Sequence, residues 1–135
     1  MNRSLGFAVI VLLSFAVPLV AHHGTPDSYD NSKLITGKAT VTGFVFKNPH
    51  VALFFDTTDE HNNVRHWSGE MANPATFIRV GWNKKRSEDA LKPGTQITIS
   101  YYLSLLDEHL PPDVGAALVV RIRDSNNQPV LLDRN

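Results

Sequence analysis

Histidines are the residues of this chain whose chemistry stands out. There are six of them and no cysteine, so any metal would bind through nitrogen or oxygen ligands. His22 and His23 directly follow an apolar segment that ends at Ala21. A cut after Ala21 would bring a free α-amine, two imidazoles and an amide nitrogen within two residues, a donor set that favours Cu(II) or Ni(II). The alternative is that the pair is only a polar start to a segment that holds nothing.

A second candidate metal site combines His50 with Glu70. His50 opens one predicted strand and Glu70 closes the next, and in an antiparallel meander these two positions lie at the same end of the sheet. Period-two alternation also places His66 and Ser68 on the face of Glu70. Two imidazoles and a carboxylate can hold a metal ion. The structural alternative is that His50 bonds to backbone, while Glu70 pairs with Arg79 or caps the following helix.

A metal-free alternative is a module that binds a small ligand or an envelope protein. Asn48 stands in the loop before His50, and His66 would offer a polar contact. Trp67 and Trp82 would form an aromatic platform of the kind that stacks on planar ligands. The competing interpretation places both tryptophans in a small core. The remaining histidines, in polar loops, receive no role.

Catalytic patterns are missing from the sequence. It has no cysteine, no Gly-x-Ser-x-Gly turn, no phosphate-binding loop and no carboxylate pair with diagnostic spacing. We therefore expect no enzyme, with a metal-dependent hydrolase as a third alternative. Thirteen basic residues balance thirteen acidic ones, and removal of Arg3 with the N-terminal segment leaves twelve against thirteen. A near-neutral domain is a poor partner for nucleic acid.

The N-terminal segment has the form of a secretory signal peptide. Arg3 precedes an apolar run over residues 5–20, and we expect cleavage after Ala21 and a periplasmic location. A membrane anchor would need about 20 uninterrupted apolar residues, and this run is shorter and contains Pro18. We expect no membrane span after cleavage. The 114 residues left (135 minus 21) suffice for one domain over 22–135, with a flexible arm over 22–32.

Short strands must position these residues. Alternating apolar residues between turn-forming segments predict strands over 38–46, 51–57, 64–70, 96–105 and 115–123. A last hairpin around 125–127 leads into 130–132. Tyr29 is expected to pin the arm to this body.

One helix is predicted between the third and fourth strands. Asn73 and Pro74 are a typical N-cap and first helical residue, and Gly81 suits the end. The expected apolar stripe consists of Phe77, Ile78 and Val80. Residues 83–91 are open between a second helical turn and a loop.

The same alternation predicts which side chains share a face. In the first strand Ala39, Val41 and Val45 oppose Thr40, Thr42 and Phe44, and Gly43 is expected at a bulge. In the fourth strand the shared face holds Ile97, Ile99, Tyr101, Leu103 and Leu105. In the fifth strand it holds Leu118, Val120 and Ile122.

The order of elements, three strands, a helix and two strands, is that of the five-stranded OB barrel. We therefore predict an all-β domain with one short helix and an OB-like fold. The alternative is a small β-sandwich.

Several short motifs together resemble one family. They are His22-His23, Asn48-Pro49-His50, the run from His66 to Glu70 that contains Trp67, the Arg79 to Trp82 segment, and Lys92-Pro93-Gly94. This set is similar to a family of exported bacterial proteins defined only as domain of unknown function six-one-five-two. The resemblance implies an exported small β-rich domain and names no reaction. The chain departs from the family between Trp82 and Leu91, where it is a few residues longer.

Overall fold

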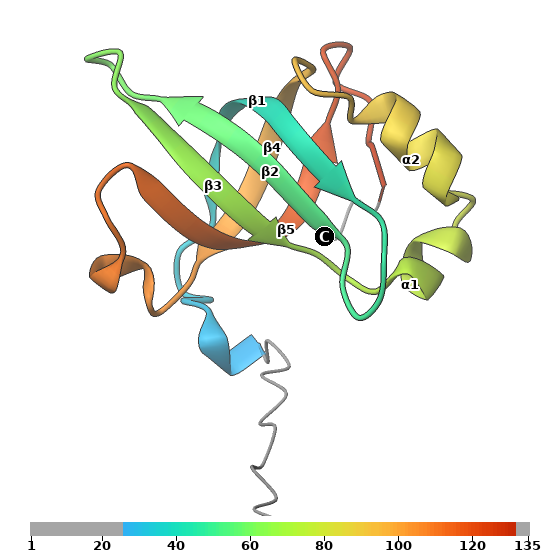
Figure 1. Ribbon diagram of the computed structural model, residues 1–135, viewed down its shortest axis with the longest axis horizontal. Helices are drawn as coiled ribbons and strands as arrows, with labels where there is room; N and C mark the ends of the chain where they lie inside the picture. Colours follow the sequence, from blue (N-terminus) through green and yellow to red (C-terminus); the bar gives the residue numbers. More distant parts are fainter. Residues whose placement is uncertain (1–25, 132–135) are drawn as a thin grey trace, which may run out of the picture.

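The computed structural model describes residues 26–131, which form a closed five-stranded barrel (Figure 1). The strands are β1 (Ile35–Val45), β2 (Ala52–Thr58), β3 (Val64–Glu70), β4 (Gln96–Leu103) and β5 (Val114–Arg123). The helices are the 3-10 turns η1 (Pro26–Ser28) and η2 (Asp107–His109) and the α-helices α1 (Pro74–Ile78) and α2 (Lys84–Ala90). The predicted signal peptide and the pair His22-His23 lie outside the described residues.

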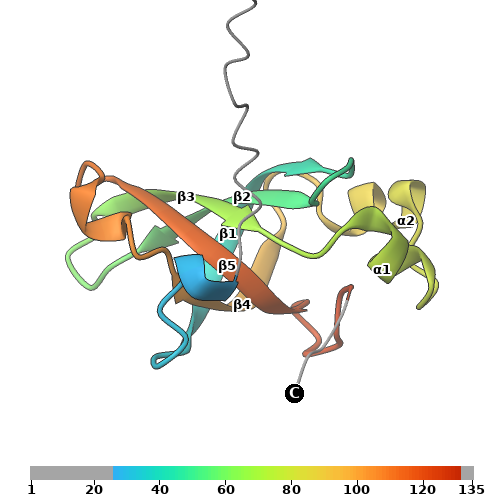
Figure 2. The same cartoon turned by 90° about the horizontal axis from the view of Figure 1, so that it is seen from below.

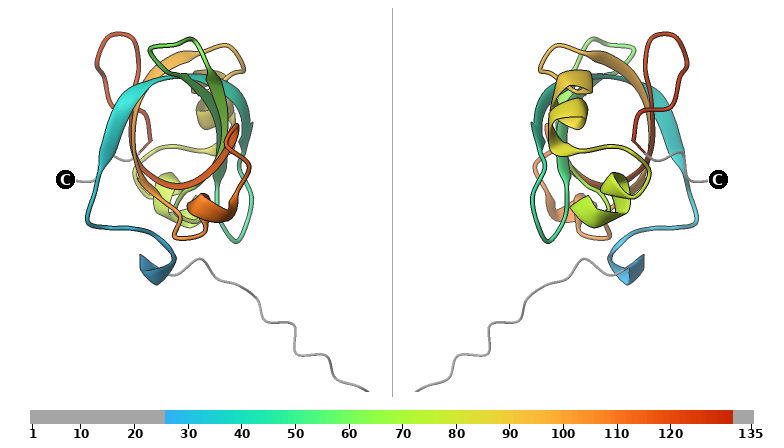
Figure 3. Two further views of the ribbon diagram at one scale, coloured as in Figure 1. Left: turned by 90° about the vertical axis from the view of Figure 1, so that its left-hand side faces the viewer. Right: turned by 90° about the vertical axis from the view of Figure 1, so that its right-hand side faces the viewer.

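The strands close in the order β1-β2-β3-β5-β4, and β1 pairs with both β2 and β4. Only the β3–β5 pair is parallel among the strands described. Figure 3 shows the resulting ring when the barrel is seen from its two ends. The predicted OB-like barrel is therefore confirmed. The sandwich alternative is wrong, because a single sheet closes on itself.

The two α-helices lie together at one end of the barrel, and η2 lies at the opposite end (Figures 1 and 2). Each helix begins at an asparagine whose side chain accepts a backbone N–H three residues on, at Asn73 for α1 and Asn83 for α2. The predicted start at Asn73 is confirmed, and the open segment after Trp82 is helical. None of the helices described is long and apolar enough to cross a membrane.

The apolar stripe predicted for α1 is only partly correct. Phe77 is fully buried, whereas Ile78 is 55 % exposed and Val80 is 51 % exposed. The helix is five residues long and buries only Pro74 and Phe77. Placing Ile78 and Val80 in the core was therefore wrong.

A bulge in β1 reverses its alternation. The pairing with β2 shifts between Val41 and Gly43, as the glycine suggested. Beyond the shift Phe44 opposes the fully buried Leu53 and packs against the core, and Val45 turns to the other side. The prediction that Val45 faces inward and Phe44 outward was wrong, because the extra residue moves every later side chain to the opposite face.

The inner face of β5 consists of smaller residues than predicted. Ala117 and Val119 are buried, whereas Leu118 and Val120 are only half-buried. The predicted inward set was wrong in those two positions and right for Ile122, since an irregularity opposite Ser100 changes the phase of the strand. In the fourth strand Leu105 was also misplaced, because β4 ends at 103 and Leu105 is 55 % exposed.

Trp67 explains the need for small residues on β5. Its ring stacks on Phe55 at 5.9 Å between centroids and meets Tyr101 at 5.0 Å. Gly115, the register partner of Trp67, lies so close that an added Cβ would be 2.3 Å from the ring. The core side chains are Ala39, Val41, Val51, Leu53, Phe55, Trp67, Met71, Phe77, Leu91, Ile97, Ile99, Tyr101, Ala117, Val119, Ile122, Val130 and Leu131. Aromatic residues thus fill the middle of the barrel.

The last described residues close over this core. Asp124 and Gln128 bracket a tight turn, and Arg123 forms an isolated bridge with Pro129. Val130 and Leu131 are buried beyond it. The predicted final turn is confirmed, although the bridge replaces a full last strand.

Candidate functional site

A cluster that we call the arm clasp joins Tyr29, His50 and Glu70. His50 Nδ1 lies 2.8 Å from Glu70 Oε1, and the Tyr29 hydroxyl donates to Glu70 Oε2 at 2.7 Å. His50 lies in the loop between β1 and β2, and Glu70 is the last residue of β3. The two residues that the sequence placed at one end of the sheet are therefore in contact. The expected helix-capping role of Glu70, or its pairing with Arg79, is replaced by these two bonds.

The partners of His50 determine its tautomer. Nδ1 is also 3.1 Å from the carbonyl oxygen of Met71, so both neighbours of this nitrogen are acceptors. Nδ1 must therefore carry the proton, and in the neutral ring Nε2 presents a lone pair. The His50 side chain is 32 % exposed. An oriented imidazole with an accessible acceptor nitrogen is the arrangement found in metal ligands.

The arm reaches the clasp by pairing with the end of β4. Tyr29 forms an isolated bridge with Ser104, and the N–H of Asp30 donates to the carbonyl of Leu103 at 2.9 Å. Burial, together with the bond to the Glu70 carboxylate, raises the pKa of Tyr29 well above its usual range. Tyr29 therefore stays protonated and donates, and it pins this part of the arm to the barrel as the sequence suggested.

A second candidate site is a shallow depression on the outside of the sheet, which we call the β2–β3 hollow. It has a volume of about 370 Å³. It is lined by Thr42, Phe54, Asp56, His66, Trp67, Ser68 and Val114. All but Trp67 turn their side chains outward, and Trp67 contributes from the core side. The hollow therefore belongs to the exposed surface of the barrel.

The shape of the hollow follows from small residues beside one large ring. Phe54 is 38 % exposed and opposes Gly43 on one neighbouring strand and Ser68 on the other. A Cβ on Gly43 would lie 3.3 Å from Cδ2 of Phe54, so the ring rests over the glycine. The next cross-strand pair is Asp56 with His66. The floor at Ser68 thus has an aromatic wall on one side and an ionisable pair on the other.

The ionisable pair of the hollow is built like the clasp. His66 Nδ1 lies 2.7 Å from Asp56 Oδ1, which again leaves Nε2 as the outward acceptor in the neutral ring. His66 shares a face with Glu70, as predicted, but its partner is Asp56. In the part of the chain that the structure describes, no three or more His, Asp or Glu residues are grouped to hold a metal. His66 and the His50–Glu70 pair therefore form two separate sites.

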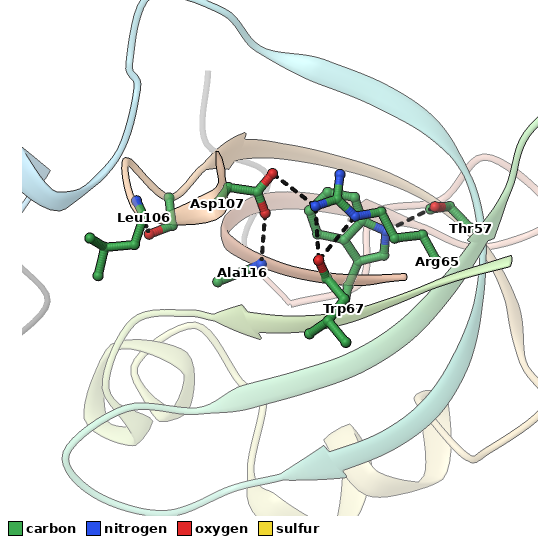
Figure 4. Close-up of polar contacts among 8 residues, drawn as sticks. Thr57, Arg65, Trp67, Leu106, Asp107 and Ala116 are labelled. Atoms are coloured by element: carbon green, nitrogen blue, oxygen red, sulfur yellow. Dashed lines mark hydrogen bonds and ion pairs between the residues drawn. The ribbon is translucent and has the colours of Figure 1, made fainter. Parts of the chain in front are cut away.

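The far end of the barrel is closed by an ion pair that the sequence analysis missed. Arg65 Nη2 lies 2.9 Å from Asp107 Oδ2, and Asp107 Oδ1 accepts the N–H of Ala116 (Figure 4). The Arg65 guanidinium lies over the Trp67 ring, 4.5 Å from its centroid, and the indole N–H donates to Thr57. The only signal in the sequence was an arginine at an inward position of a strand. Its role here is structural, because it covers the core.

The two tryptophans do not form a joint platform. Trp67 is 6 % exposed within the barrel, whereas Trp82 packs against the edge of the core under the guanidinium of Arg86, 3.9 Å from its ring centroid. Asn48, proposed as a ligand contact, is exposed in the loop before His50 and does not line the hollow. Of the proposed ligand contacts, the hollow therefore contains His66 and the edge of Trp67.

Comparisons with known proteins identify the family of the chain but no activity. A family model described as a family of unknown function (DUF6152) matches residues 9–106. No curated protein and no solved structure matches the chain.

Proposed function

The chain belongs to DUF6152, a family of unknown function, and we propose from its own residues that it is an exported module that binds a transition metal, copper above all. The metal would bind through the mature N-terminus at His22 and His23, with His50 as a ligand from the barrel. The arm clasp is the observation that carries this proposal.

The clasp supports a ligand role for His50 and a different role for Glu70. Glu70 uses one oxygen for His50 and the other for Tyr29. A carboxylate that fixes the Nδ1 proton of a histidine sets the direction of its Nε2. We therefore assign Nε2 of His50 to the metal and make Glu70 a positioning residue.

The arm supports the participation of the N-terminal donors. Tyr29 is fixed beside His50 through their shared carboxylate. His23 stands six positions before Tyr29, a length of chain that spans up to roughly 20 Å when extended. His22 and His23 are thus tethered within reach of the barrel imidazole.

The donor chemistry favours copper. The proposed ligands are an α-amine and imidazoles, which suit Cu(II) and Ni(II), and Cu(II) binds more tightly in the usual order of divalent metals. Amines titrate near pH 8 and imidazoles near 6.5. Protons should therefore displace the metal below about pH 6.

The test is a Cu(II) titration of the chain that starts at His22, with electron paramagnetic resonance of the loaded protein. The exported chain is first identified by intact-mass spectrometry, which also tests the proposed cleavage after Ala21 and periplasmic location. One added N-terminal residue, or His22→Ala, should weaken binding at least about tenfold. His50→Ala should reduce the number of coupled nitrogens in the spectrum. Glu70→Gln should weaken binding about tenfold.

His61→Ala is the matched control, because His61 lies in the exposed loop between β2 and β3 and belongs to neither site. If neither the N-terminal extension nor His22→Ala changes the affinity for copper, the proposed N-terminal site is wrong. A spectrum unchanged by His50→Ala would remove the barrel ligand.

A further inference from the structure

We propose that the β2–β3 hollow is a separate binding site for a neutral saccharide ring. It shares no residue with the arm clasp. The proposal is therefore independent of metal binding, and either can fail without the other.

The hollow combines two exposed apolar side chains with four polar ones. Phe54 and Val114 are exposed apolar side chains, 38 % and 37 % accessible, and they border the hollow on different strands. Asp56, His66, Thr42 and Ser68 supply a carboxylate, an imidazole and two hydroxyls. A sugar ring can use both kinds of group, since its C–H face packs on an aromatic ring such as Phe54 and its hydroxyls surround the rim.

The charge of the lining favours a neutral ligand. No lysine or arginine is among the residues that line the hollow, and Asp56 brings a carboxylate. Arg65 lies beside the hollow, because it donates to the carbonyl of Val114 at 2.8 Å, but its guanidinium is paired with Asp107. An anionic group such as a phosphate would meet the Asp56 carboxylate with no lysine or arginine in the lining to balance it. Phosphorylated ligands are therefore disfavoured here.

The polar groups are placed for hydroxyl donors. A carboxylate can accept about four hydrogen bonds, and His66 Nδ1 uses one of these at Oδ1 of Asp56. The same bond turns Nε2 of His66 outward as an acceptor. Two acceptors on adjacent strands can thus receive vicinal hydroxyls, while Thr42 and Ser68 can both donate and accept.

The size limits the ligand to about one ring. Small-molecule sites span roughly 300–1,000 Å³, and the hollow, at about 370 Å³, is at the small end. It is also open to solvent along the sheet, so a longer chain could extend beyond the ring that contacts Phe54. We expect millimolar affinity for a single sugar, since a shallow site buries little of its ligand.

Trp67 provides the assay, because it lines the hollow and the chain has only one other tryptophan, Trp82 at the helical end. In the Trp82→Phe variant, titration with glucose, maltose, N-acetylglucosamine and its dimer should change Trp67 emission in a saturable way for at least one sugar. Shifts of the Phe54, His66 and Ser68 amide signals in a heteronuclear NMR spectrum are the second measurement, and they do not depend on the tryptophan.

Three variants separate a binding site from a bystander surface. Three substitutions should each weaken sugar binding at least about tenfold. Phe54→Ala removes the aromatic ring, Ser68→Ile fills the floor and Asp56→Asn removes the charge. Ile78→Ala is the matched control, because Ile78 is an exposed apolar residue on α1 outside the hollow. Circular dichroism checks that each variant is folded.

Two results would overturn the proposal. One is that none of the sugars shifts the emission or the amide signals. The other is binding that survives Phe54→Ala and Ser68→Ile. Adenosine and inorganic phosphate are included as probes: binding of adenosine without any sugar would make the ligand a flat heteroaromatic ring, and binding of phosphate alone would contradict the charge argument.

Discussion

Single residues set the packing of this barrel, and Gly115 is the clearest case. We expect Gly115→Ala to destabilise the fold by about 1–3 kcal/mol, because the new Cβ would meet the Trp67 ring at 2.3 Å. The ring cannot move aside, since Phe55 and Tyr101 hold it. Urea unfolding followed by circular dichroism measures the effect.

Gly37→Ala is the control for this substitution. Gly37 also lies in a strand, but a Cβ there would meet nothing within 4 Å. We expect no loss, or a gain of about 0.4–1 kcal/mol from the stiffer unfolded chain. Equal losses at both glycines would show that the close approach to Trp67 is not the cause.

Tyr29 gives the fold a pH dependence at the alkaline end. Its pKa is raised above the unfolded value of about 10, so its contribution to stability is complete below pH 10 and is lost as the pH rises further. The unfolding free energy should fall as the pH rises above about 10, and less steeply in Tyr29→Phe. Tyr101, whose pKa burial also raises, would account for the remaining slope.

At neutral pH Tyr29→Phe removes one hydrogen bond and should cost about 1 kcal/mol. The loss should be local. Hydrogen exchange at Asp30, whose N–H is bonded to Leu103, should speed up before the core amides change. Unchanged exchange at Asp30 would mean that the hydroxyl does not hold the arm.

At the scale of elements, caps decide where the helices form. Asn83→Ala should cost about 1 kcal/mol, because the Asn83 side chain accepts the N–H of Arg86 at the start of a helix only seven residues long. Asn83→Asp keeps an acceptor oxygen and should retain most of the stability. Thermal unfolding of the two variants side by side measures the difference, and an equal loss in both would contradict the capping role.

The sequence predicted both the order of the elements and the contact between His50 and Glu70, because both follow from a three-strand meander. A three-strand meander places His50 and Glu70 at one end whatever the details of packing, and they lie 2.8 Å apart. The sequence did not predict which side chains of a strand face the core where a bulge shifts the pairing. The bulge beside Gly43 was visible, but the reversal at Phe44 depends on where the shift falls in the pairing. Leu118 was placed inside because it alternates with Val120 and Ile122, but a shift in the pairing with β4 changes the phase between Val119 and Arg121.

The ion pair between Arg65 and Asp107 was beyond such reasoning. The two residues are 42 positions apart, and no periodicity links a strand position to a loop residue. The hollow was not predicted for a similar reason, since it depends on the small residues that oppose Phe54 on the two neighbouring strands. Local sequence patterns predict strands and helices. The ion pair and the hollow form only when the strands close into a barrel, so local patterns do not predict them.

At the scale of the whole molecule, the barrel and its helical end share one core. Phe77 and Leu91, at the two helices, belong to the same cluster as Trp67, and Trp82 packs against it. We therefore expect two-state unfolding. In the Trp82→Phe variant, Trp67 emission and far-ultraviolet circular dichroism should give the same urea midpoint. Separate midpoints would mean that the helical end unfolds on its own.

The filled interior has a kinetic consequence. Phe55, Trp67 and Tyr101 occupy the middle of the barrel and Arg65 covers its far end, so a ligand in the β2–β3 hollow lies on the outside of the barrel. No strand has to part for the ligand to enter or leave. Exchange should therefore be limited by diffusion and by the strength of the contacts, with lifetimes far shorter than those of ligands enclosed in hollow barrels. Substitutions that stiffen the core should change the rate of unfolding and leave the rate of ligand exchange untouched.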